Sequence, residues 1–486
     1  KAVLLSPGGA LLHAQSVGLK TWTGSEGAVE QQPEQWYRAL TDIAQQWWQR
    51  GIDAASIRMI ALTGQMQNLI AIDRQGAPLG PALLYSDVRA SREADSVNLR
   101  FGKDALRKAV GNPTTAASLL PKLIYFRQHY PELYSQTHKV LFGAKDYLIN
   151  ALCGKAVCDP TTASTTGLLL LQDRVWYRDL LESFEFAQDL MPGLYAPEQV
   201  VGSVSNGASA VTGFMAGTPV ICGVGDAAAT ALGAGAANTS EPYLYVGTTG
   251  WVAHQIRSGD AKPAAETVFT LCSPEPDAMI RIAPVLNAGN VLAWALTLLG
   301  HTPEEDPAVF YALLDAEAAA SGDTEALMFI PYISPERCPI ATLASHGAFI
   351  GISARTTRAQ MLRAVFDGIA LSLRWCGDML DIATAGNMAA IGGGTRSRVF
   401  MQAVADAFNT TLHLHPDADL LAAAGAARIA ARVLGWNAGL DTTRETAVAD
   451  PRRIVYPDER RSDALRNAYP RFRQVAEAIT ALPLES

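Results

Sequence analysis

Cysteine is scarce in this sequence of 486 residues: there are six, and no two of them form a CxxC pair. A zinc cage or a disulfide framework needs cysteines at closer spacing, so neither is predicted, and a reducing, cytoplasmic setting fits this usage best. The eight histidines are scattered and form no HExxH pattern or other metal-ligand spacing. Any metal is therefore expected to arrive together with a bound ligand.

Charged residues are also few, at 18% of the chain, and the net charge is −8. An acidic balance argues against nucleic acid as a partner, although a few backbone amides can still bind a small anion locally. The longest uncharged stretch, residues 199–225, is interrupted throughout by Gly, Ser, Asn, Thr and Pro. We therefore predict no membrane span, no signal peptide and no membrane partner.

Short apolar runs alternate with helix-like segments along the chain. Residues 3–5 and 10–14 flank a Ser-Pro-Gly-Gly turn and are predicted to form a hairpin, and residues 70–73 begin a second one. A similar order of strands and helices begins again near the middle of the chain. This repetition predicts an α/β fold of two domains, residues 1–237 and 238–486, around a central cleft.

Two segments bear on how these domains are joined. Residues 230–239 are rich in Ala and Gly and carry no charge, so we expect a hinge there, with an Ala-rich helix as the alternative. Residues 456–482 carry arginines at helical spacing and are predicted to form an amphipathic helix with a solvated charged face. We expect this last helix to pack back on the first domain.

The first motif with chemical meaning is Pro219-Val-Ile-Cys-Gly-Val-Gly-Asp226. An apolar strand runs into Gly-x-Gly and then into one carboxylate at the start of an Ala-rich helical run. This position suits a helix N-cap, and on this segment alone the N-cap ranks above catalysis. The functional interpretation of Asp226 is a general base that accepts a hydroxyl proton.

Two further motifs are rich in glycine. Gly247-Thr248-Thr249-Gly250 interrupts a β-like segment and predicts a hairpin whose amides and hydroxyls can face phosphate oxygens. Gly392-Gly393-Gly394 stands between a strand-like and a helix-like segment, where the lack of side chains suits a flat purine or a phosphate. Neither the GxxxxGK[ST] nor the GxGxxG pattern occurs, so ordinary P-loop or nicotinamide binding is not predicted.

In this order over two α/β halves, the three motifs resemble those of the FGGY carbohydrate kinases. Gly347-Ala-Phe-Ile-Gly351-Ile, followed after seven residues by Gln360-Met-Leu-Arg-Ala-Val-Phe-Asp367, is similar to the long C-terminal signature of that family. The resemblance covers nearly the whole chain. It implies the actin-like ATPase fold, in which two ribonuclease-H-like domains close on a sugar and ATP.

The resemblance also implies roles for particular residues. Asp226 is the expected catalytic base, and it meets a metal only indirectly, through Mg-ATP. The residues expected to line the sugar pocket are Gln65, Met66, Gln67 and Asp87. The residues expected to surround the nucleotide are Gly247, Thr248, Thr249, Gly392, Gly393 and Gly394. The implied reaction transfers the γ-phosphoryl group of ATP, with Mg²⁺, to a hydroxyl of a ketopentose, D-xylulose before others, in a protein that pairs with a second copy as a homodimer.

Departures from the family pattern keep alternatives open. Ketopentose kinases of the family usually have His where this chain has Gln67 and Asn where it has Ala227, so ribulose, another ketose or a glycerol-like polyol is an alternative substrate. The family's Asp-x-Gly-Thr phosphate loop, which ends in Lys, is absent, and Lys1 stands where its last residue would be. Either the sequence omits about ten residues, or the protein is a sugar or nucleotide sensor that does not catalyse. A chaperone-type ATPase is disfavoured, because the polar residues around Gln65 and Asp87 suit a small polyol.

Overall fold

The structure is a computed structural model and describes residues 1–235, 241–260, 264–301, 306–319, 327–342, 344–382, 386–415, 420–436 and 450–483. The strands of the first half are β1 (Ala2–Leu5), β2 (Leu11–Gln15), β3 (Trp22–Thr23), β4 (Val29–Gln31), β5 (Ile70–Ile72), β6 (Ala82–Leu83), β7 (Lys139–Leu141), β8 (Val157–Cys158), β9 (Leu169–Leu170), β10 (Val175–Trp176), β11 (Gly193–Leu194), β12 (Val200–Ser203) and β13 (Pro219–Ile221). Its helices are α1 (Pro33–Gln49), α2 (Ser91–Phe101), α3 (Lys103–Val110), α4 (Leu119–His129), α5 (Pro131–Gln136), α6 (Ala144–Cys153), α7 (Pro160–Ala163), α8 (Arg178–Ser183), α9 (Asn206–Thr212) and α10 (Asp226–Gly233).

The second half has longer strands and helices. Its strands are β14 (Tyr243–Val246), β15 (Gly250–Arg257), β16 (Phe269–Cys272), β17 (Ala278–Val285), β18 (Met328–Ile330), β19 (Ala348–Ile350), β20 (Asn387–Ile391), β21 (Thr411–Leu414) and β22 (Ile454–Val455). Its helices are α11 (Gly289–Leu298), α12 (Pro307–Ala319), α13 (Arg358–Met379), α14 (Arg398–Phe408), α15 (Leu421–Val433) and α17 (Glu459–Thr480). Short 3-10 turns are η1 (Ser25–Gly27), η2 (Ala54–Ser56), η3 (Gln188–Leu190), η4 (Ser258–Asp260), η5 (Gly393–Arg396) and η6 (Pro451–Arg453).

A mixed sheet of seven strands, in the order β16-β17-β15-β14-β20-β21-β22, organises the second half. Strands β14, β20 and β21 run parallel, with Leu244 opposite Ala390 and Ala390 opposite Leu414. The carboxyl ends of β14 and β20 therefore lie side by side, and the two glycine-rich motifs begin there. In open α/β sheets such an edge is where ligands bind.

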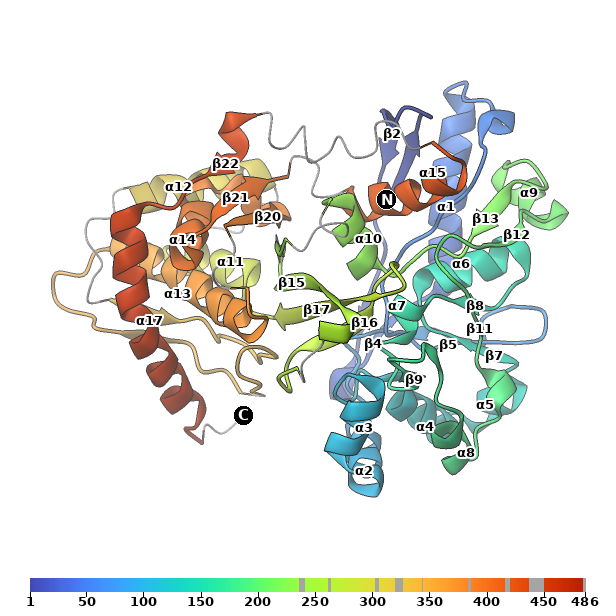
Figure 1. The fold of residues 1–486 in the computed structure, drawn as a ribbon, viewed down its shortest axis with the longest axis horizontal. Helices are drawn as coiled ribbons and strands as arrows, with labels where there is room; N and C mark the ends of the chain where they lie inside the picture. Colours follow the sequence, from blue (N-terminus) through green and yellow to red (C-terminus); the bar gives the residue numbers. More distant parts are fainter. Residues whose placement is uncertain are drawn as a thin grey trace.

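Smaller sheets and many helices make up the first half, which forms a separate lobe in Figure 1. Strands β1 and β2 pair antiparallel, with Val3 opposite Ala14, so the first predicted hairpin is confirmed. The second predicted turn also forms, because the N–H of Asp73 donates to the carbonyl of Ala77 at 3.0 Å. Strand β13 leads directly to the loop that precedes α10, and this connection positions Asp226.

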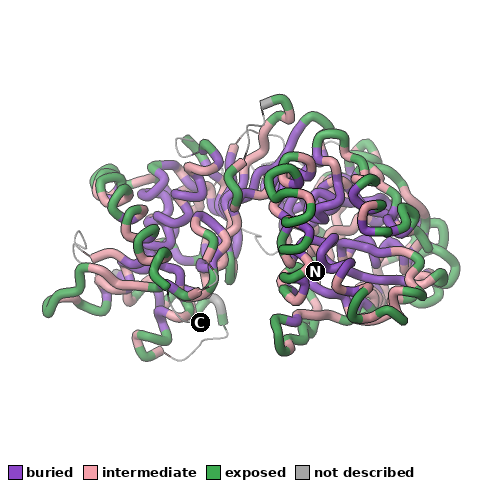
Figure 2. The backbone as a smooth tube through the Cα atoms, turned by 90° about the horizontal axis from the view of Figure 1, so that it is seen from below, coloured by how far each residue is buried: buried purple, intermediate pink, exposed green. Residues whose placement is uncertain are grey.

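Each lobe has its own apolar interior, seen as the buried parts of the tube in Figure 2. In the second lobe α13 begins with a capping box between Thr357 and Gln360, and its Phe366 packs on Phe400 of α14 in the core. In the first lobe α1 begins at Pro33 and buries Trp36 and other apolar residues at helical spacing. Hydrophobic burial thus explains why both halves fold around these helices.

Helices α10 and α15 cross at very close range between the lobes (Figure 1). A Cβ atom on Gly425 would lie 1.9 Å from the carbonyl oxygen of Ala229, and one on Gly233 would lie 2.0 Å from that of Leu421. Only glycine permits this approach. The predicted hinge at residues 230–239 is therefore wrong in its first part, because residues 230–233 end helix α10, and residues 236–239 lie outside the described residues.

The last helix forms as predicted over Glu459–Thr480, but its packing differs from our expectation. Helix α17 lies on α13 and α14 in the second lobe, and its Leu465 and Phe472 are buried in that lobe's core. It does not return to the first domain (Figure 1). The amphipathic pattern indicates that one face is buried without indicating which surface buries it.

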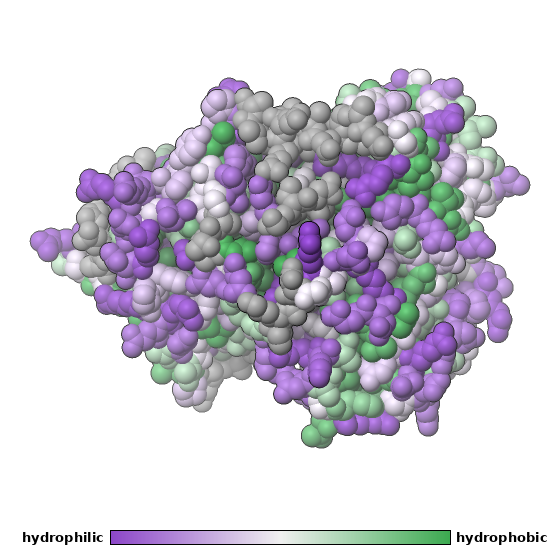
Figure 3. All heavy atoms as spheres, in the orientation of Figure 1, coloured by the Kyte–Doolittle hydropathy of each residue, from purple (hydrophilic) through white to green (hydrophobic). Residues whose placement is uncertain are grey.

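The face of the molecule in Figure 3 is covered mainly by hydrophilic residues, with smaller hydrophobic patches. Within the described ranges, no helix has both the length and the apolar character that crossing a bilayer requires.

Candidate active site

Asp226 stands at the first residue of α10, where a tight backbone turn leaves β13. Gly223 has φ 64°, and a Cβ there would lie 2.0 Å from the carbonyl oxygen of Leu62, so this turn requires glycine. The N–H of Asp226 donates to the carbonyl oxygen of Gly64 at 3.0 Å. Its side chain is half-buried. The structure therefore places a partly accessible carboxylate at a helix N-terminus, beside the Gly64 loop.

Electrostatics make this carboxylate easier to protonate than an ordinary aspartate. The pKa of Asp226 is raised to about 6: burial is the main cause, backbone N–H donors at the start of the helix oppose it, and the negative charge of Asp159 adds to it. A carboxyl whose pKa lies near neutrality can both accept a proton and release it again. Its environment therefore suits a general base, in addition to the N-terminal helix position that the sequence also indicated.

The predicted sugar residues Gln65, Met66 and Gln67 directly follow Gly64, so the loop that carries them begins beside the backbone of Asp226. A Cβ on Gly225 would lie 2.1 Å from the Met66 Sδ atom, which means that Met66 packs directly on the backbone before Asp226. Gln67 adopts a left-handed backbone conformation with φ 61°, which is unusual for a residue other than glycine. Strain of this kind often accompanies functional loops.

Asp87, the fourth predicted sugar residue, is held in an ion-pair network. Its side chain is 1% exposed, and its carboxylate accepts from the N–H of Val29 at 3.0 Å and from the Arg89 guanidinium at 2.6 Å. Arg89 also pairs with Glu30 at 2.5 Å. Asp87 therefore positions Arg89 and the backbone around it, and its oxygens are already engaged.

A cavity of about 460 Å³ lies beside the Gly64 loop, between β1, α1 and α15. Its lining is mostly apolar and includes Gln65, but it does not include Met66, Gln67, Asp87 or Asp226. A polyol needs polar groups around its hydroxyls, so this cavity does not match the predicted sugar pocket.

The two glycine-rich motifs meet at the edge of the large sheet. Gly247 donates to the carbonyl of Thr249 at 2.8 Å, and Thr248 and Thr249 are exposed at the tip of the β14–β15 hairpin. A Cβ on Gly392, whose φ is 98°, would lie 2.3 Å from the carbonyl oxygen of Val246. Since Val246 directly precedes the hairpin, the predicted nucleotide residues lie together at this end of the sheet.

This surface is connected to Asp226 through strand β14. The Tyr243 hydroxyl donates to the carbonyl oxygen of Ala227 at 3.3 Å, which ties the strand that leads to the hairpin to the first turn of α10. The donor set, with exposed threonine hydroxyls and a backbone free of side chains at Gly392–Gly394, fits the phosphates and base of a nucleotide.

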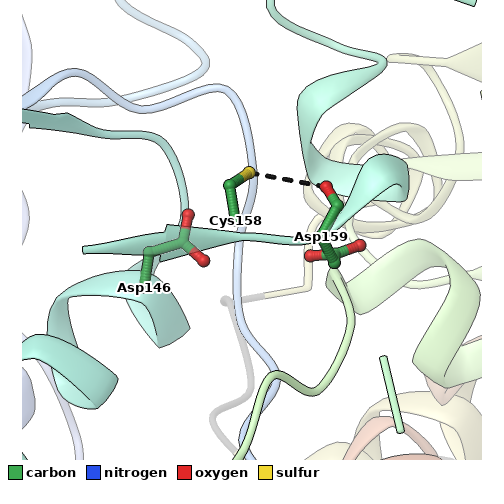
Figure 4. Close-up of side chains that lie close together, drawn as sticks. All are labelled: Asp146, Cys158 and Asp159. Atoms are coloured by element: carbon green, nitrogen blue, oxygen red, sulfur yellow. Dashed lines mark hydrogen bonds between the residues drawn. The ribbon is translucent and has the colours of Figure 1, made fainter. Parts of the chain in front are cut away.

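Three buried side chains, Asp146, Cys158 and Asp159, lie within 4.8 Å of one another and could in principle hold a metal (Figure 4). The Lys145 ammonium, however, lies 2.7 Å from an Asp146 oxygen and 2.9 Å from an Asp159 oxygen, where a cation would sit. Although burial lowers the pKa of Lys145, the two carboxylates raise it overall. The cluster is therefore an internal ion-pair network whose positive charge is supplied by the chain.

This network contacts the backbone just before the candidate base through Thr162. The Thr162 hydroxyl donates to Asp159 at 2.6 Å, and a Cβ on Gly225 would lie 2.9 Å from that same hydroxyl. The start of α6 also touches the sugar loop, because the N–H of Ala144 donates to the carbonyl of Gln65 at 3.1 Å. The charge of Asp159 thus lies close enough to contribute to the raised pKa of Asp226.

Comparison with known proteins agrees with this geometry. Models of the N-terminal and C-terminal domains of the FGGY family of carbohydrate kinases match residues 1–233 and 246–434. The xylulose kinase of Escherichia coli (strain K12) is 30% identical over 437 residues, which cover 88% of this chain and 87% of that protein. A crystal structure of a xyloylose kinase from Brucella ovis has a TM-score of 0.87 at 26% identity, over 99% of this chain and 97% of that one. A gluconate kinase structure from Lactobacillus acidophilus also has a TM-score of 0.87, over 99% of this chain and 95% of that one, but at 24% identity it shows the fold alone.

The chain belongs to the FGGY family of carbohydrate kinases. The predicted actin-like fold of two α/β domains is confirmed. The protein is thus a sugar kinase that uses ATP, and it acts on a small-molecule sugar.

Several residues around the site were missed by sequence reasoning. Gly64, Thr162 and Lys122 contact the predicted site loops, and each contact joins segments that are distant in the chain. The available signal was local, because Gly64 adjoins Gln65 in the sequence. Such a signal does not specify which distant residue each of the three contacts.

Proposed function

We propose that this carbohydrate kinase transfers the γ-phosphoryl group of ATP to a hydroxyl of D-xylulose, which gives D-xylulose 5-phosphate. Similarity to the xylulose kinase of Escherichia coli and to the xyloylose kinase of Brucella ovis supports this substrate. The observation that carries the proposal is the position of Asp226, which is bonded through its N–H to Gly64 and follows Gly225, on which Met66 packs, with its pKa raised to about 6.

In this proposal Asp226 orients the sugar hydroxyl and accepts its proton as the phosphoryl group is transferred. Phosphoryl transfer leaves little covalent chemistry to the protein, so position and charge supply the catalysis. Above a pH of about 6 the carboxyl is ionised and can act as a base. Gln65, Met66, Gln67 and Asp87 form the sugar side, with Asp87 acting through Arg89.

The nucleotide side would be held by Gly247, Thr248 and Thr249 at the phosphates and by Gly392, Gly393 and Gly394 at the adenosine. The hairpin supplies hydroxyl and amide donors, and the glycines allow close approach to the backbone. Bound Mg²⁺ would neutralise charge on the phosphates, and Asp226 would be its indirect contact through ATP. The side chains present fit such a ligand, because the exposed groups there are neutral donors.

We also propose the domain division at residues 237 and 238, a homodimer and a cytoplasmic location. The family matches over residues 1–233 and 246–434 support the division. All six cysteines are free thiols, which supports a reducing compartment.

The test is ADP release from Mg-ATP, measured by a coupled assay with D-xylulose, D-ribulose and glycerol in parallel. Selective turnover of D-xylulose is the expected result. A stronger response to D-ribulose or glycerol would overturn the substrate, and Gln67 and Ala227 would then be the first residues to examine. Saturable binding of D-xylulose in calorimetry without ADP release would instead identify a sensor.

A further inference from the structure

Lys122 is a buried lysine whose amino group ends between two loops. Lys122 lies in α4 and is 1% exposed. Its Nζ donates to the carbonyl oxygen of Gln67 at 2.9 Å and to that of Leu84 at 2.5 Å. Within the described ranges, Lys122 forms no ion pair with a carboxylate. Its two hydrogen bonds therefore go to backbone atoms of two other segments.

Both carbonyl groups belong to loops that carry proposed sugar residues. Gln67 is itself one of these residues, and its left-handed backbone needs support from its surroundings. Leu84 accepts the N–H of Asp87 at 3.0 Å through the same carbonyl group that Lys122 contacts. One amino group thus connects the backbone of the Gln65–Gln67 loop to the turn that holds Asp87.

We propose that Lys122 is a positioning residue of the sugar site, which fixes the Gln67 and Leu84 loops relative to each other so that the pocket is preorganised for the sugar. The proposal rests on the proposed function, because it assigns both loops to sugar binding. A preorganised pocket spends less binding free energy on ordering its loops, so the effect is expected in sugar affinity. ATP binding, which is assigned to loops of the seven-stranded sheet, should be insensitive to the loss of Lys122.

The charge of Lys122 gives this arrangement a pH dependence. The pKa of Lys122 is lowered to about 7: burial is the main cause, the charge of Asp87 opposes it, and the charges of Arg337 and Arg89 add to it. The neutral amine keeps two N–H donors for the two carbonyls, but charge-assisted hydrogen bonds are stronger than neutral ones. The loops are therefore held more weakly as pH rises through about 7, and the KM for the sugar should increase.

The experiment compares Lys122→Met with a matched control, Lys139→Met, in the full chain. Lys139 also donates to two backbone carbonyls, those of Asp189 and Met191, but at β7 and away from both sugar loops. With D-xylulose as the varied substrate, K122M should raise its KM by about tenfold or more, with kcat and the KM for ATP near parental values. K139M should leave all three constants unchanged.

Two results from K122M would overturn the proposal. One is a parental sugar KM in K122M, and the other is an equal loss in the constants for sugar and ATP, which would indicate a purely structural role. If K122M does not fold, the parental enzyme still decides the matter, because a sugar KM that stays flat between about pH 6 and about pH 8 contradicts the assigned charge dependence. Parental activity in Asp226→Asn would refute the proposed base whatever K122M does. If another sugar of the panel is the substrate, the same comparison is made with that sugar.

Discussion

The backbone N–H of Asp226 lies 3.0 Å from the carbonyl oxygen of Gly64 and donates to it. This bond joins the start of α10 to the loop that carries Gln65, Met66 and Gln67. The candidate base and the sugar loop are therefore joined in one backbone framework. The nucleotide loops belong to a different sheet and reach this framework through the bond between Tyr243 and Ala227.

Replacement of Asp226 by Asn should lower kcat by roughly 10² to 10⁴, because an amide cannot accept the hydroxyl proton. In the parental protein kcat should fall as pH drops below about 6, where the carboxyl becomes protonated.

Because the pKa of Asp226 is raised in the folded state, the folded protein binds this proton more tightly than the unfolded chain does, and ionisation costs stability above about pH 4. D226N should therefore unfold at a higher temperature than the parent at pH 7.5 or thereabouts. Steady-state kinetics and thermal denaturation check both effects, and parental turnover in D226N would remove Asp226 from its role.

Gly225→Ala tests whether Met66 must occupy its present position. The φ of Gly225 is −58°, so alanine meets no backbone strain, but its Cβ would lie 2.1 Å from the Met66 Sδ atom and 2.9 Å from the Thr162 hydroxyl, so Met66 has the larger clash to relieve. Displacement of Met66 should raise the KM for D-xylulose by about tenfold to about a hundredfold and leave the KM for ATP unchanged. Gly207→Ala is the control, because its Cβ would have no neighbour within 4 Å. Equal sugar KM values in the two variants would contradict this function of Met66.

Sequence analysis could predict the loops of the candidate site because each loop is encoded by neighbouring residues. A strand, a glycine turn and a helix-forming run are consecutive around Asp226, and the same holds around Gly392. The contacts between loops could not be predicted in this way. The bonds of Lys122 to Gln67 and Leu84 join distant segments, and no periodicity specifies such pairs.

The errors in the fold have a similar physical origin. Residues 230–239 are uncharged and rich in Ala and Gly, which suggested a hinge. Close packing of α10 on α15 at Gly425 nevertheless stabilises residues 230–233 as helix. The pattern of α17 indicated a buried face correctly, while the surface that covers it, on α13 and α14, depends on tertiary structure. The role of Asp87 was implied by the family resemblance, but its engagement with Arg89 required coordinates.

Gly392→Ala and Gly393→Ala should separate folding from nucleotide binding. At Gly392 the added Cβ would lie 2.3 Å from a Val246 backbone oxygen at a φ of 98°, so we expect a loss of roughly 1 to 3 kcal/mol or more in the free energy of unfolding. At Gly393 the nearest atom is the Tyr311 hydroxyl at 3.0 Å, which can move, so stability should stay within about 0.5 kcal/mol of the parent. G393A should nonetheless raise the KM for ATP by about tenfold, because it adds a side chain to the proposed adenosine surface.

Urea denaturation and ATP saturation curves measure these two effects. An unchanged free energy of unfolding in G392A would show that the strands β14 and β20 can separate at no cost. An unchanged KM for ATP in G393A would exclude Gly393 from the nucleotide site.

Lys145→Met should strongly destabilise the fold, because it leaves Asp146 and Asp159 buried without their shared counter-charge. Removal of one partner from a buried ion pair costs about 3 to 5 kcal/mol. The loss should shrink as pH falls, since burial raises the pKa of Asp146 and protonation of that carboxyl removes part of the uncompensated charge. Lys103→Met is the matched control: Lys103 pairs with Glu266 at 3.1 Å, but both side chains are more than half exposed, so its removal should cost at most about 1 kcal/mol. Urea denaturation at neutral and mildly acidic pH measures both variants, and similar, small losses in the two would mean that Lys145 is not the cation that holds this cluster together.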